Sequence, residues 1–376
     1  MKYYIICGEA SGDLHASNLM KQIKLLDHEA EFRFWGGDLM EKQGGKIVRH
    51  YKELSFMGFW EVISNISVII KNIEYCKKDI LEYKPDALIL VDYPGFNLRI
   101  AEFARKENLK IFYYISPQIW AWKQSRVKKI KRDVDKMLVV LPFEKDFYKK
   151  LDFEVEFVGH PLLDAIDDFK QNIISNEIFI NKNNLNEKPI VALLPGSRKQ
   201  EVSKILPIML DLQSNFEDYQ FVIAGTEAIS KDFYYELIRN RDIKIIYNQT
   251  YQLLNHSYAA LVKSGTGTLE TALFEVPEVV CYKAVRTSYF IAKYLISFKL
   301  KFISLVNLIM NRKIVSELIQ ENYKNINLKN ELGKILNDKE CRENMIKEYK
   351  ELRKNLGGIG ASKRSAEIII DYLRKN

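Results

Sequence analysis

Cysteine and histidine are scarce in this sequence, and they are not grouped. The chain of 376 residues contains four cysteines and five histidines. No two cysteines form a C-x-x-C pair, and no histidine lies at metal-ligand spacing from them. Scattered cysteines are typical of proteins in a reducing compartment. We therefore expect a cytoplasmic protein with no structural metal and no cofactor.

Long apolar runs and several nucleotide motifs are missing as well. No uncharged apolar stretch approaches the ~20 residues that cross a bilayer, so membrane contact would have to be peripheral. The sequence has neither the G-x-x-x-x-G-K-[ST] loop of nucleotide hydrolases nor the G-x-G-x-x-G dinucleotide fingerprint. It also lacks a recognised nucleic-acid module. The formal charge of +8 favours an anionic ligand or an anionic membrane surface.

What the chain does have is a regular alternation of apolar strand-like runs and helical stretches. Ala87–Val91 is a continuous apolar run, as in a parallel sheet covered on both faces. The polar stretch 167–188 separates two such alternations and predicts an interdomain linker. We expect an α/β protein with an N-terminal domain over 1–168, a C-terminal domain over 185–345, and a helical tail over 346–376 that returns to the N-terminal domain.

The heptapeptide from Ser264 to Glu270 reads as a tight loop between a strand and a helix. Ser264, Gly265 and Thr266 are small residues at the place where a phosphate would approach the N–H groups of the first helical turn. Glu270 would lie in that turn, where the helix dipole keeps a carboxylate ionised and able to accept two sugar hydroxyls. An ordinary capped helix explains the same residues, so both interpretations stay open.

A second glycine turn favours phosphate binding. Gly196, Ser197 and Arg198 follow the strand-like run that ends at Leu194. Arg198 would supply a permanent cation whose guanidinium can bind two oxygens of a diphosphate. Two such loops, each placed after a strand, predict one cleft that binds a diphosphate.

Asp92 stands at the carboxyl end of the apolar run 87–91. In open α/β sheets, ligands bind beyond the carboxyl ends of the strands, so Asp92 is well placed for chemistry. The alternative is an aspartate that serves only a turn or a helix cap. The sequence pattern does not decide between these two interpretations.

Apolar residues recur at helical spacing from position 56 onward and form an unusually broad stripe. One interpretation is a helix packed against the sheet. The other is a surface that dips into lipid, favoured by the lysines at 71, 77 and 78. The residues assigned to this candidate membrane surface are Phe56, Phe59, Trp60 and Ile63.

Seven short motifs resemble, in the same order, those of the lipid-A-disaccharide synthase family, and they span most of the chain. They are Gly8–Asp13, Met57-Gly58 with Glu61-Val62, Asp92 with Pro94 and Phe96-Asn97, Ser116–Trp122, Gly159–Pro161, Leu193–Arg198, and Ser264–Thr266 with Leu269-Glu270. The resemblance implies the GT-B architecture, in which two doubly wound Rossmann-like domains face a cleft. It also implies an inverting glycosyltransferase that joins UDP-2,3-diacylglucosamine to 2,3-diacylglucosamine 1-phosphate through a β(1→6) bond and releases UDP.

The resemblance assigns roles to particular residues. Asp92 would be the general base, ionised at neutral pH if its pKa is near the ordinary ~3.9. The donor and UDP site would comprise Gly196, Ser197, Arg198, Ser264, Gly265, Thr266, Glu270, Asn307, Glu317 and Gln320. The N-terminal loops that receive the acceptor would comprise Glu9, Ser11, Gly12, Asp13, Met57, Gly58, Ser116, Gln118 and Trp120.

Four positions depart from the family pattern: Gly95, Lys123, Lys263 and Val306. Val306 stands where proline is usual, so the backbone that presents Asn307 is expected to be less fixed. The implied location is the cytoplasmic face of the inner membrane of a bacterium, as a peripheral protein. A homodimer is a further expectation, raised by the long C-terminal tail.

Three rival functions keep the same architecture. A non-hydrolysing UDP-sugar epimerase would use the same loops but would need neither the broad apolar stripe nor the Trp120-Ala121-Trp122 surface. The transferase that adds N-acetylglucosamine to a lipid-linked wall precursor would share both domains and a membrane face. A non-catalytic UDP-sugar or lipid-binding protein would not need Asp92.

Overall fold

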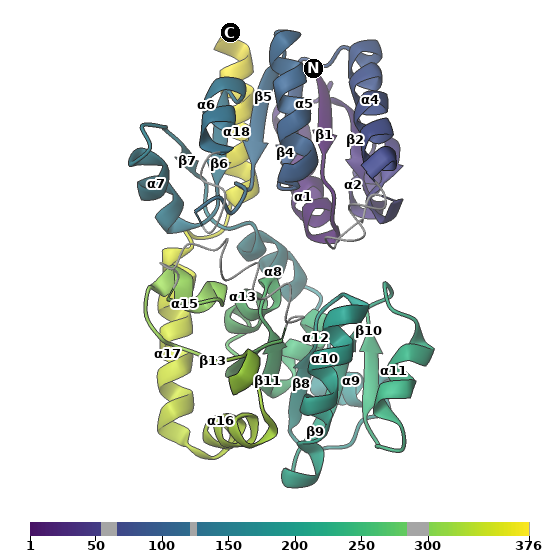
Figure 1. Ribbon diagram of the computed structural model, residues 1–376, viewed down its shortest axis with the longest axis vertical. Helices are drawn as coiled ribbons and strands as arrows, with labels where there is room; N and C mark the ends of the chain where they lie inside the picture. Colours follow the sequence, from purple (N-terminus) through teal and green to yellow (C-terminus); the bar gives the residue numbers. More distant parts are fainter. Residues whose placement is uncertain (54–65, 121–125, 284–300, 376) are drawn as a thin grey trace. The chain divides into compact units, whose positions relative to one another are not determined.

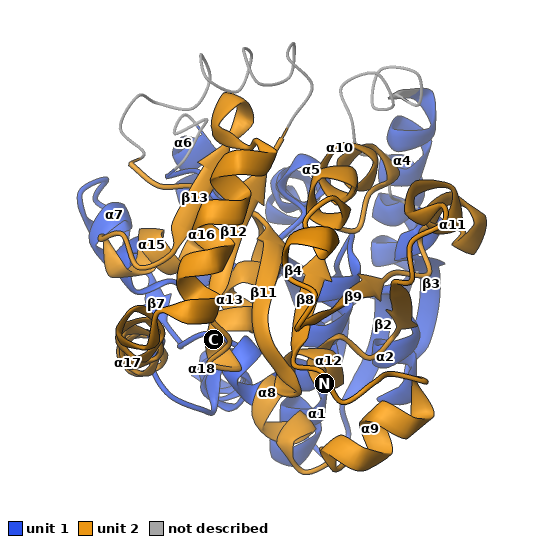
Figure 2. Cartoon of the chain, turned by 90° about the horizontal axis from the view of Figure 1, so that it is seen from below, with its two compact units in different colours: residues 1–165, 356–376 blue, residues 166–355 orange. Residues whose placement is uncertain are grey.

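The computed structural model describes residues 1–53, 66–120, 126–283 and 301–375. The chain forms two compact units, residues 1–165 with 356–376 (unit 1) and residues 166–355 (unit 2), coloured separately in Figure 2. Each unit contains one parallel β-sheet with helices on its faces (Figure 1). The expected α/β class with two Rossmann-like domains is confirmed.

Unit 1 contains a seven-stranded parallel sheet in the order β3-β2-β1-β4-β5-β6-β7. Its strands are β1 (Lys2–Ile6), β2 (Glu31–Gly36), β3 (Lys46–His50), β4 (Ala87–Val91), β5 (Lys110–Tyr114), β6 (Lys136–Val139) and β7 (Glu156–Phe157). Its helices are α1 (Ala10–Leu26), α2 (Asp38–Lys42), η1 (Tyr51–Glu53), α4 (Ile66–Tyr83), α5 (Pro94–Lys106), α6 (Val127–Asp133), α7 (Pro142–Lys149) and α18 (Ala361–Lys375), while α8 (Leu162–Lys170) spans the division between the units.

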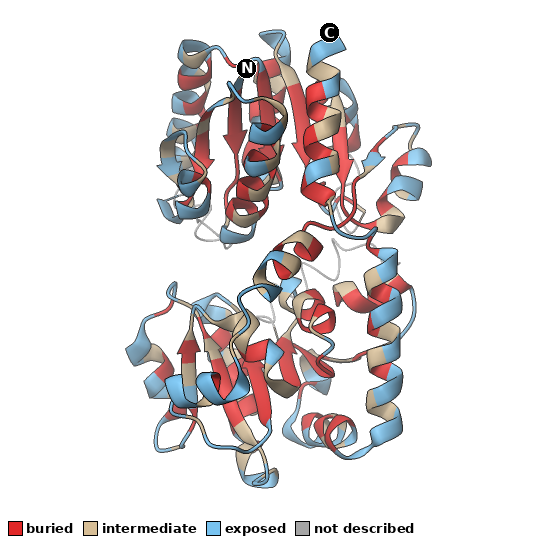
Figure 3. Cartoon of the chain, turned by 180° about the vertical axis from the view of Figure 1, so that it is seen from behind, coloured by how far each residue is buried: buried red, intermediate tan, exposed pale blue. Residues whose placement is uncertain are grey.

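Burial on both faces explains why the central strands of unit 1 read as unbroken apolar runs. All five residues of β4 are buried, and the central strands of the sheet are drawn mostly as buried in Figure 3. Helices α4, α5 and α6 cover one face, and α1 packs against α18 on the other. The ring of Tyr372 on α18 meets that of Phe112 on β5 edge-on at 5.5 Å.

Unit 2 contains a six-stranded parallel sheet in the order β10-β9-β8-β11-β12-β13. Its strands are β8 (Ile190–Leu194), β9 (Gln220–Gly225), β10 (Lys244–Tyr247), β11 (Ser257–Lys263), β12 (Glu278–Tyr282) and β13 (Ser316–Ile319). Its helices are α9 (Asn176–Lys182), α10 (Lys199–Leu210), η3 (Gln213–Asn215), α11 (Lys231–Ile238), α12 (Thr250–Asn255), α13 (Thr266–Leu273), α15 (Leu305–Met310), η4 (Gln320–Asn322), α16 (Asn325–Asn337) and α17 (Lys339–Asn355).

The stretch expected to be a polar linker is helical over much of its length. Helix α9 occupies part of it, and Ser175 caps this helix by accepting a hydrogen bond from the Ile178 N–H at 3.3 Å. The one large aromatic residue of α9, Phe179, is fully buried and stacks on His256 at 4.7 Å. A single anchoring side chain among polar residues gives too weak a periodic signal to identify the helix from the sequence.

The chain returns to unit 1 after α17. The expected limit between residues 345 and 346 falls inside this helix, and the division lies at 355/356 instead. Asp164 fixes the start of α18 by accepting hydrogen bonds from the N–H groups of Gly360, Ala361 and Ser362. In the part of the chain that the structure describes, no helix is long and apolar enough to span a membrane.

Candidate functional site

Each sheet has one switch point: the strands that come first in the sequence extend the sheet to one side of this point, and the later strands extend it to the other side. In unit 1 this point lies between β1 and β4, and in unit 2 it lies between β8 and β11. The crevice beyond the strand carboxyl ends at such a point is where open α/β sheets bind ligands. The Gly8 loop and Asp92 follow β1 and β4, and the two candidate phosphate loops follow β8 and β11. The sequence-predicted sites therefore stand at the topologically favoured position of each unit.

Asp92 lies in a backbone conformation that L-residues seldom adopt. Its φ is 44° and that of Tyr93 is 48°, so the chain turns sharply from β4 into α5. The carbonyl of Asp92 accepts hydrogen bonds from the Tyr113 hydroxyl at 2.6 Å and from the Asn97 amide at 2.8 Å. The Asn97 amide also reaches the carbonyl of Ile6, at the end of β1. Left-handed non-glycine residues held in this way occur mainly at functional sites.

Asp92 is exposed as a whole residue, but protein atoms surround its carboxyl group closely enough to desolvate it. Desolvation is the main cause that raises its pKa to about 7, followed by repulsion from the Glu9 carboxylate. The expectation of an ordinary pKa is therefore wrong. The surroundings of Asp92, which bring Glu9 close to it, are not visible in the spacing of the two residues along the chain. A base with a pKa near 7 is better matched to proton transfer at neutral pH than one near 4.

The loop after β1 is shaped by close contacts. A Cβ on Gly8 would lie 2.5 Å from the Tyr93 ring, and one on Gly12 would lie 2.9 Å from Cys7 Cβ. Glycine at both positions therefore lets the loop and α1 approach the sheet. Glu9 is half-buried and Ser11 is exposed at the start of α1, so both can meet a ligand.

Asp13, also expected in the acceptor loop, is buried and serves α2. Its carboxylate accepts hydrogen bonds from the N–H groups of Gly37, Leu39 and Met40, at 2.8, 3.0 and 3.1 Å. These are the orphan donors of a helix N-terminus. The structure thus gives Asp13 a positioning role for this corner of the sheet.

The segment after β5 is held by contacts with residues of α7. The Ser116 hydroxyl lies 2.6 Å from the Tyr148 hydroxyl, and Trp120 packs edge-on against Phe143 at 5.0 Å. Burial raises the pKa of the nearby Glu144 to about 7, and hydrogen bonds from the N–H groups of Val140 and Leu141 limit the rise. Of the three residues predicted here, Gln118 is the exposed one.

Six predicted residues lie outside the described part of the chain: Phe56, Met57, Gly58, Phe59, Trp60 and Ile63. The same holds for Lys123 of the 121–125 segment. The end of the apolar stripe that is described, on α4, presents Val68 and Ile70 to solvent with 38% and 52% of their surfaces exposed.

In unit 2, the loop after β8 leads into α10. Gly196 has a φ of 108°, a left-handed value that glycine adopts without strain. Ser197 and Arg198 are exposed, and Arg198 is the N-cap residue of α10. The guanidinium of Arg198 lies 3.5 Å from Glu201, one turn into the same helix. An exposed cation at a helix N-terminus suits an anionic ligand.

The loop after β11 leads into α13, which begins at Thr266. Gly265 and Thr266 are exposed, and the Ser264 hydroxyl donates to the Ile303 carbonyl at 3.2 Å. Glu270 lies in the second turn of α13, not in the first, so the expected dipole effect does not reach it. Burial raises its pKa, and the Tyr251 hydroxyl, which donates to Glu270 Oε1 at 3.0 Å, limits that rise.

Asn307 and Glu317 form one hydrogen-bond network with the start of α15. Glu317 accepts from the N–H groups of Ile303 and Ser304, each at 3.0 Å, and from the Asn307 amide at 2.9 Å. Asn307 Oδ1 accepts from the backbone of residues 314 and 315. Asn307 is therefore rigidly placed although Val306 replaces proline, which corrects the expectation of a looser backbone. The buried Asn307 side chain, together with Glu317, therefore supports the segment at residues 303 and 304.

Gln320 directly follows β13, as the first residue of η4, and has a left-handed conformation with φ at 50°. Its amide nitrogen is buried, and no hydrogen-bond partner is found for it in the described part of the chain. Gln320 thus retains hydrogen-bonding capacity at the carboxyl edge of the sheet.

Sequence reasoning missed four contributors to these sites. Asn97 and Tyr113 hold Asp92, and Glu201 and Lys263 form an ion pair of 2.9 Å between the two loops of unit 2. The i,i+3 spacing of Arg198 and Glu201 was a usable signal. The contact between Tyr113 and Asp92 could not be predicted from the sequence, because Tyr113 lies on β5 and Asp92 follows the neighbouring strand β4.

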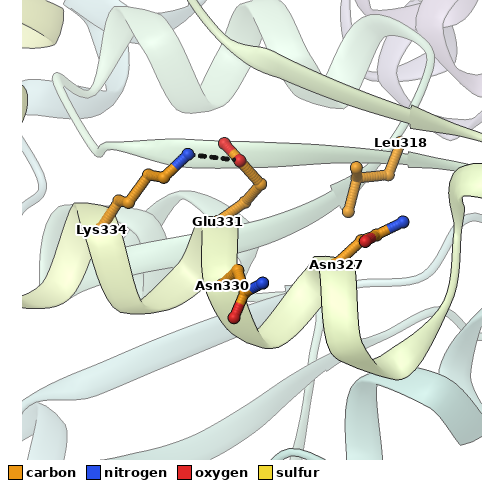
Figure 4. A pocket seen from close by; sticks show the side chains of 5 residues that line it. All are labelled: Leu318, Asn327, Asn330, Glu331 and Lys334. Carbon is orange, nitrogen blue, oxygen red and sulfur yellow. Dashed lines mark hydrogen bonds and ion pairs between the residues drawn. The ribbon is translucent and has the colours of Figure 1, made fainter.

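A hollow of about 430 Å³ lies elsewhere in unit 2, between α16 and β13. Its lining residues are Leu318, Asn327, Asn330, Glu331 and Lys334 (Figure 4). Glu331 and Lys334 are paired with each other at 2.7 Å, and the hollow contains no residue of either phosphate loop. We therefore assign it no part in the site. Within the described residues, no group of three or more His, Cys, Asp and Glu side chains could hold a metal ion.

Comparison with known proteins agrees with this geometry. Residues 3–370 match the family described as lipid-A-disaccharide synthetase. The lipid-A-disaccharide synthase of Trichlorobacter lovleyi is 35% identical over 378 residues, covering 99% of this chain and 97% of that protein.

Two solved structures share the fold at low identity. The UDP-GlcNAc 2-epimerase of Neisseria meningitidis, bound to UDP-GlcNAc, superposes with a TM-score of 0.68 at 13% identity over 100% of both chains. The glycotransferase of kitacinnamycin superposes with a TM-score of 0.64 at 12% identity over 98% of both chains. The chain therefore belongs to the lipid-A-disaccharide synthetase family, glycosyltransferases of lipid A biosynthesis that have the GT-B fold.

Proposed function

We propose that this enzyme condenses UDP-2,3-diacylglucosamine with 2,3-diacylglucosamine 1-phosphate, giving a β(1→6)-linked disaccharide 1-phosphate and UDP. The observation that carries the proposal is Asp92. Asp92 is an exposed residue at the switch point of unit 1, its backbone carbonyl accepts hydrogen bonds from Asn97 and Tyr113, and its carboxyl group has a pKa of about 7. Such a group can accept the proton of an acceptor hydroxyl.

The change from an α-linked donor to a β product requires inversion by direct attack. The acceptor oxygen forms its bond to the anomeric carbon while the bond from that carbon to the diphosphate oxygen breaks. Asp92 takes the hydroxyl proton, and UDP departs with the bonding electrons. Arg198 and the N–H groups at the starts of α10 and α13 would stabilise the negative charge on UDP.

Sugar recognition is assigned to polar groups around the second loop of unit 2. Glu270 can accept a sugar hydroxyl, and Tyr251 orients it through their hydrogen bond. Gln320 can donate through its buried amide. Asn307 and Glu317 hold the loop that carries Ser264 through the contacts with residues 303 and 304. In unit 1, Glu9, Ser11 and Gln118 are the accessible candidates for acceptor contacts.

The test is UDP release by the purified enzyme, with donor alone and with donor plus acceptor. Asp92→Asn is expected to lower kcat by roughly 10²- to 10⁴-fold and to leave the Kd for UDP unchanged. Asp152→Asn is the matched control, because Asp152 is also an exposed aspartate with a left-handed φ, 51°. Turnover that survives in Asp92→Asn would make Asp92 structural. Conversion of the donor without acceptor would favour the epimerase reaction.

We also propose that the enzyme works as a peripheral protein on the cytoplasmic face of the inner membrane. Both proposed substrates carry acyl chains, and Val68 and Ile70, at the described end of the apolar stripe on α4, are exposed. Replacing Phe59 and Trp60 with Ser is expected to weaken binding to anionic lipid vesicles by roughly tenfold or more. Thermal unfolding of the soluble variant should stay unchanged. A loss of folding would instead place these residues in a core.

A further inference from the structure

Lys263 occupies the place where the two loops of unit 2 meet. It is the last residue of β11, and its ammonium forms a 2.9 Å ion pair with Glu201 of α10. A Cβ on Gly196 would lie 3.5 Å from Lys263 Cδ, and one on Gly265 would lie 3.9 Å from Lys263 Nζ. The side chain therefore runs past the glycine of the first loop, and its charge ends beside the glycine of the second.

Glu201 connects this ammonium to the guanidinium of Arg198. The same carboxylate oxygen, Oε1, lies 2.9 Å from Lys263 Nζ and 3.5 Å from one terminal nitrogen of Arg198. Two cations thus share one anion, which leaves a net charge of +1 in this triad. The triad stands at the N-terminal turn of α10, where the helix dipole adds further positive potential.

The triad also stays within reach of a ligand. The side chains of Lys263 and Glu201 are 21% and 20% exposed, and that of Arg198 is 51% exposed. A purely structural ion pair would not need to stand at the switch point between β8 and β11.

We propose that Lys263 is the second diphosphate-binding cation of the donor site, acting together with Arg198, and that Glu201 orients both. This inference rests on the proposed function, because it assigns the diphosphate of the UDP donor to this place. An ammonium and a guanidinium on opposite loops can each bind one phosphate of the pair. Glu201 holds the two long side chains in place before the ligand arrives, which reduces the entropy lost on binding.

The test compares the Kd values of UDP and uridine, measured by calorimetry. Lys263→Met keeps the unbranched stem beside Gly196 and removes the charge. It is expected to weaken UDP binding by about 10- to 100-fold and to change uridine binding by less than about twofold, because only UDP carries the diphosphate. Lys263→Arg should restore most of the affinity for UDP.

Lys339→Met is the matched control, since Lys339 is an exposed lysine of the same unit, 3.7 Å from Glu343. Should Lys263→Met fail to fold, Lys263→Gln retains a hydrogen-bonding group toward Glu201 and takes its place with the same readout. Equal weakening of UDP and uridine, or unchanged UDP binding, would overturn the role of Lys263. A wild-type enzyme that does not prefer UDP to uridine would refute the donor site itself, so the two failures are distinguishable.

Discussion

At the scale of single residues, Asp92 should dominate the pH dependence of the reaction. Its pKa of about 7 means that the carboxyl group of this proposed base loses its proton only as the pH rises through neutrality. We expect kcat/KM to increase with pH up to about 7 and then to level off. Glu9→Gln removes the negative charge that raises this pKa, so the rising limb should move to lower pH. A limb unmoved in this variant would belong to another group.

The same group links stability to pH. The folded-state pKa lies above the ordinary value of ~3.9, so the folded protein binds more protons than the unfolded chain between about pH 4 and 7. The contribution of Asp92 to the unfolding free energy is therefore present at low pH and lost as the pH rises through 7. Asp92→Asn should be more stable than the wild type at pH 8 and no more stable at pH 4, as urea unfolding would show.

Asn97 positions Asp92, so its substitution should lower kcat without changing the Kd for UDP. Its amide donates to carbonyls of both strands at the switch point of unit 1, and the residue is fully buried. Asn97→Leu removes these hydrogen bonds and leaves the Asp92 carbonyl with its bond from the Tyr113 hydroxyl, which should cost about 1–3 kcal/mol of unfolding free energy. A misplaced Asp92 should lower kcat by roughly 10- to 100-fold while the Kd for UDP stays the same. Equal losses in kcat and UDP affinity would indicate general damage.

At the scale of elements, we expect the polar helix α9 to be held in place mainly by one buried aromatic side chain, that of Phe179. Phe179→Ala should cost about 3–5 kcal/mol, because Phe179 is fully buried. Its neighbour Ile178 is 55% exposed, so Ile178→Ala should change stability by less than about 0.5 kcal/mol. Chemical unfolding followed by circular dichroism compares the two. Similar effects of both substitutions would show that α9 is not anchored in this way.

The elements that sequence reasoning placed well are those whose signal is local. The apolar run of β4 was predicted with its observed limits, Ala87–Val91, and the loops at Gly196 and Gly265 follow strands as expected. The position of Glu270 was missed by one turn, because the start of α13 depends on where the chain leaves β11. The conformation and pKa of Asp92 could not be predicted, since Glu9, Asn97 and Tyr113 reach it from other elements.

At the scale of the molecule, the two units differ in how the chain builds them. Unit 2 is one continuous segment, whereas unit 1 requires α18 from the far end of the chain. A fragment of residues 162–355, which keeps α8 whole, should fold and bind UDP with nearly the affinity of the full protein. Residues 1–165 alone should expose the face of α1 that α18 covers and should aggregate, as light scattering would detect. A stable monomer of 1–165 would contradict this assignment.

The packing of α1 against α18 also sets an order of events during translation. Helix α1 is synthesised before unit 2, whereas its partner α18 is synthesised after the whole of unit 2. Unit 2 can complete its sheet while the N-terminal strands still await their final covering helix. The half of the protein that carries Asp92 can therefore complete its fold only after α18 has been made, so a ribosome that stalls before α18 would leave a folded unit 2 attached to an unfinished unit 1.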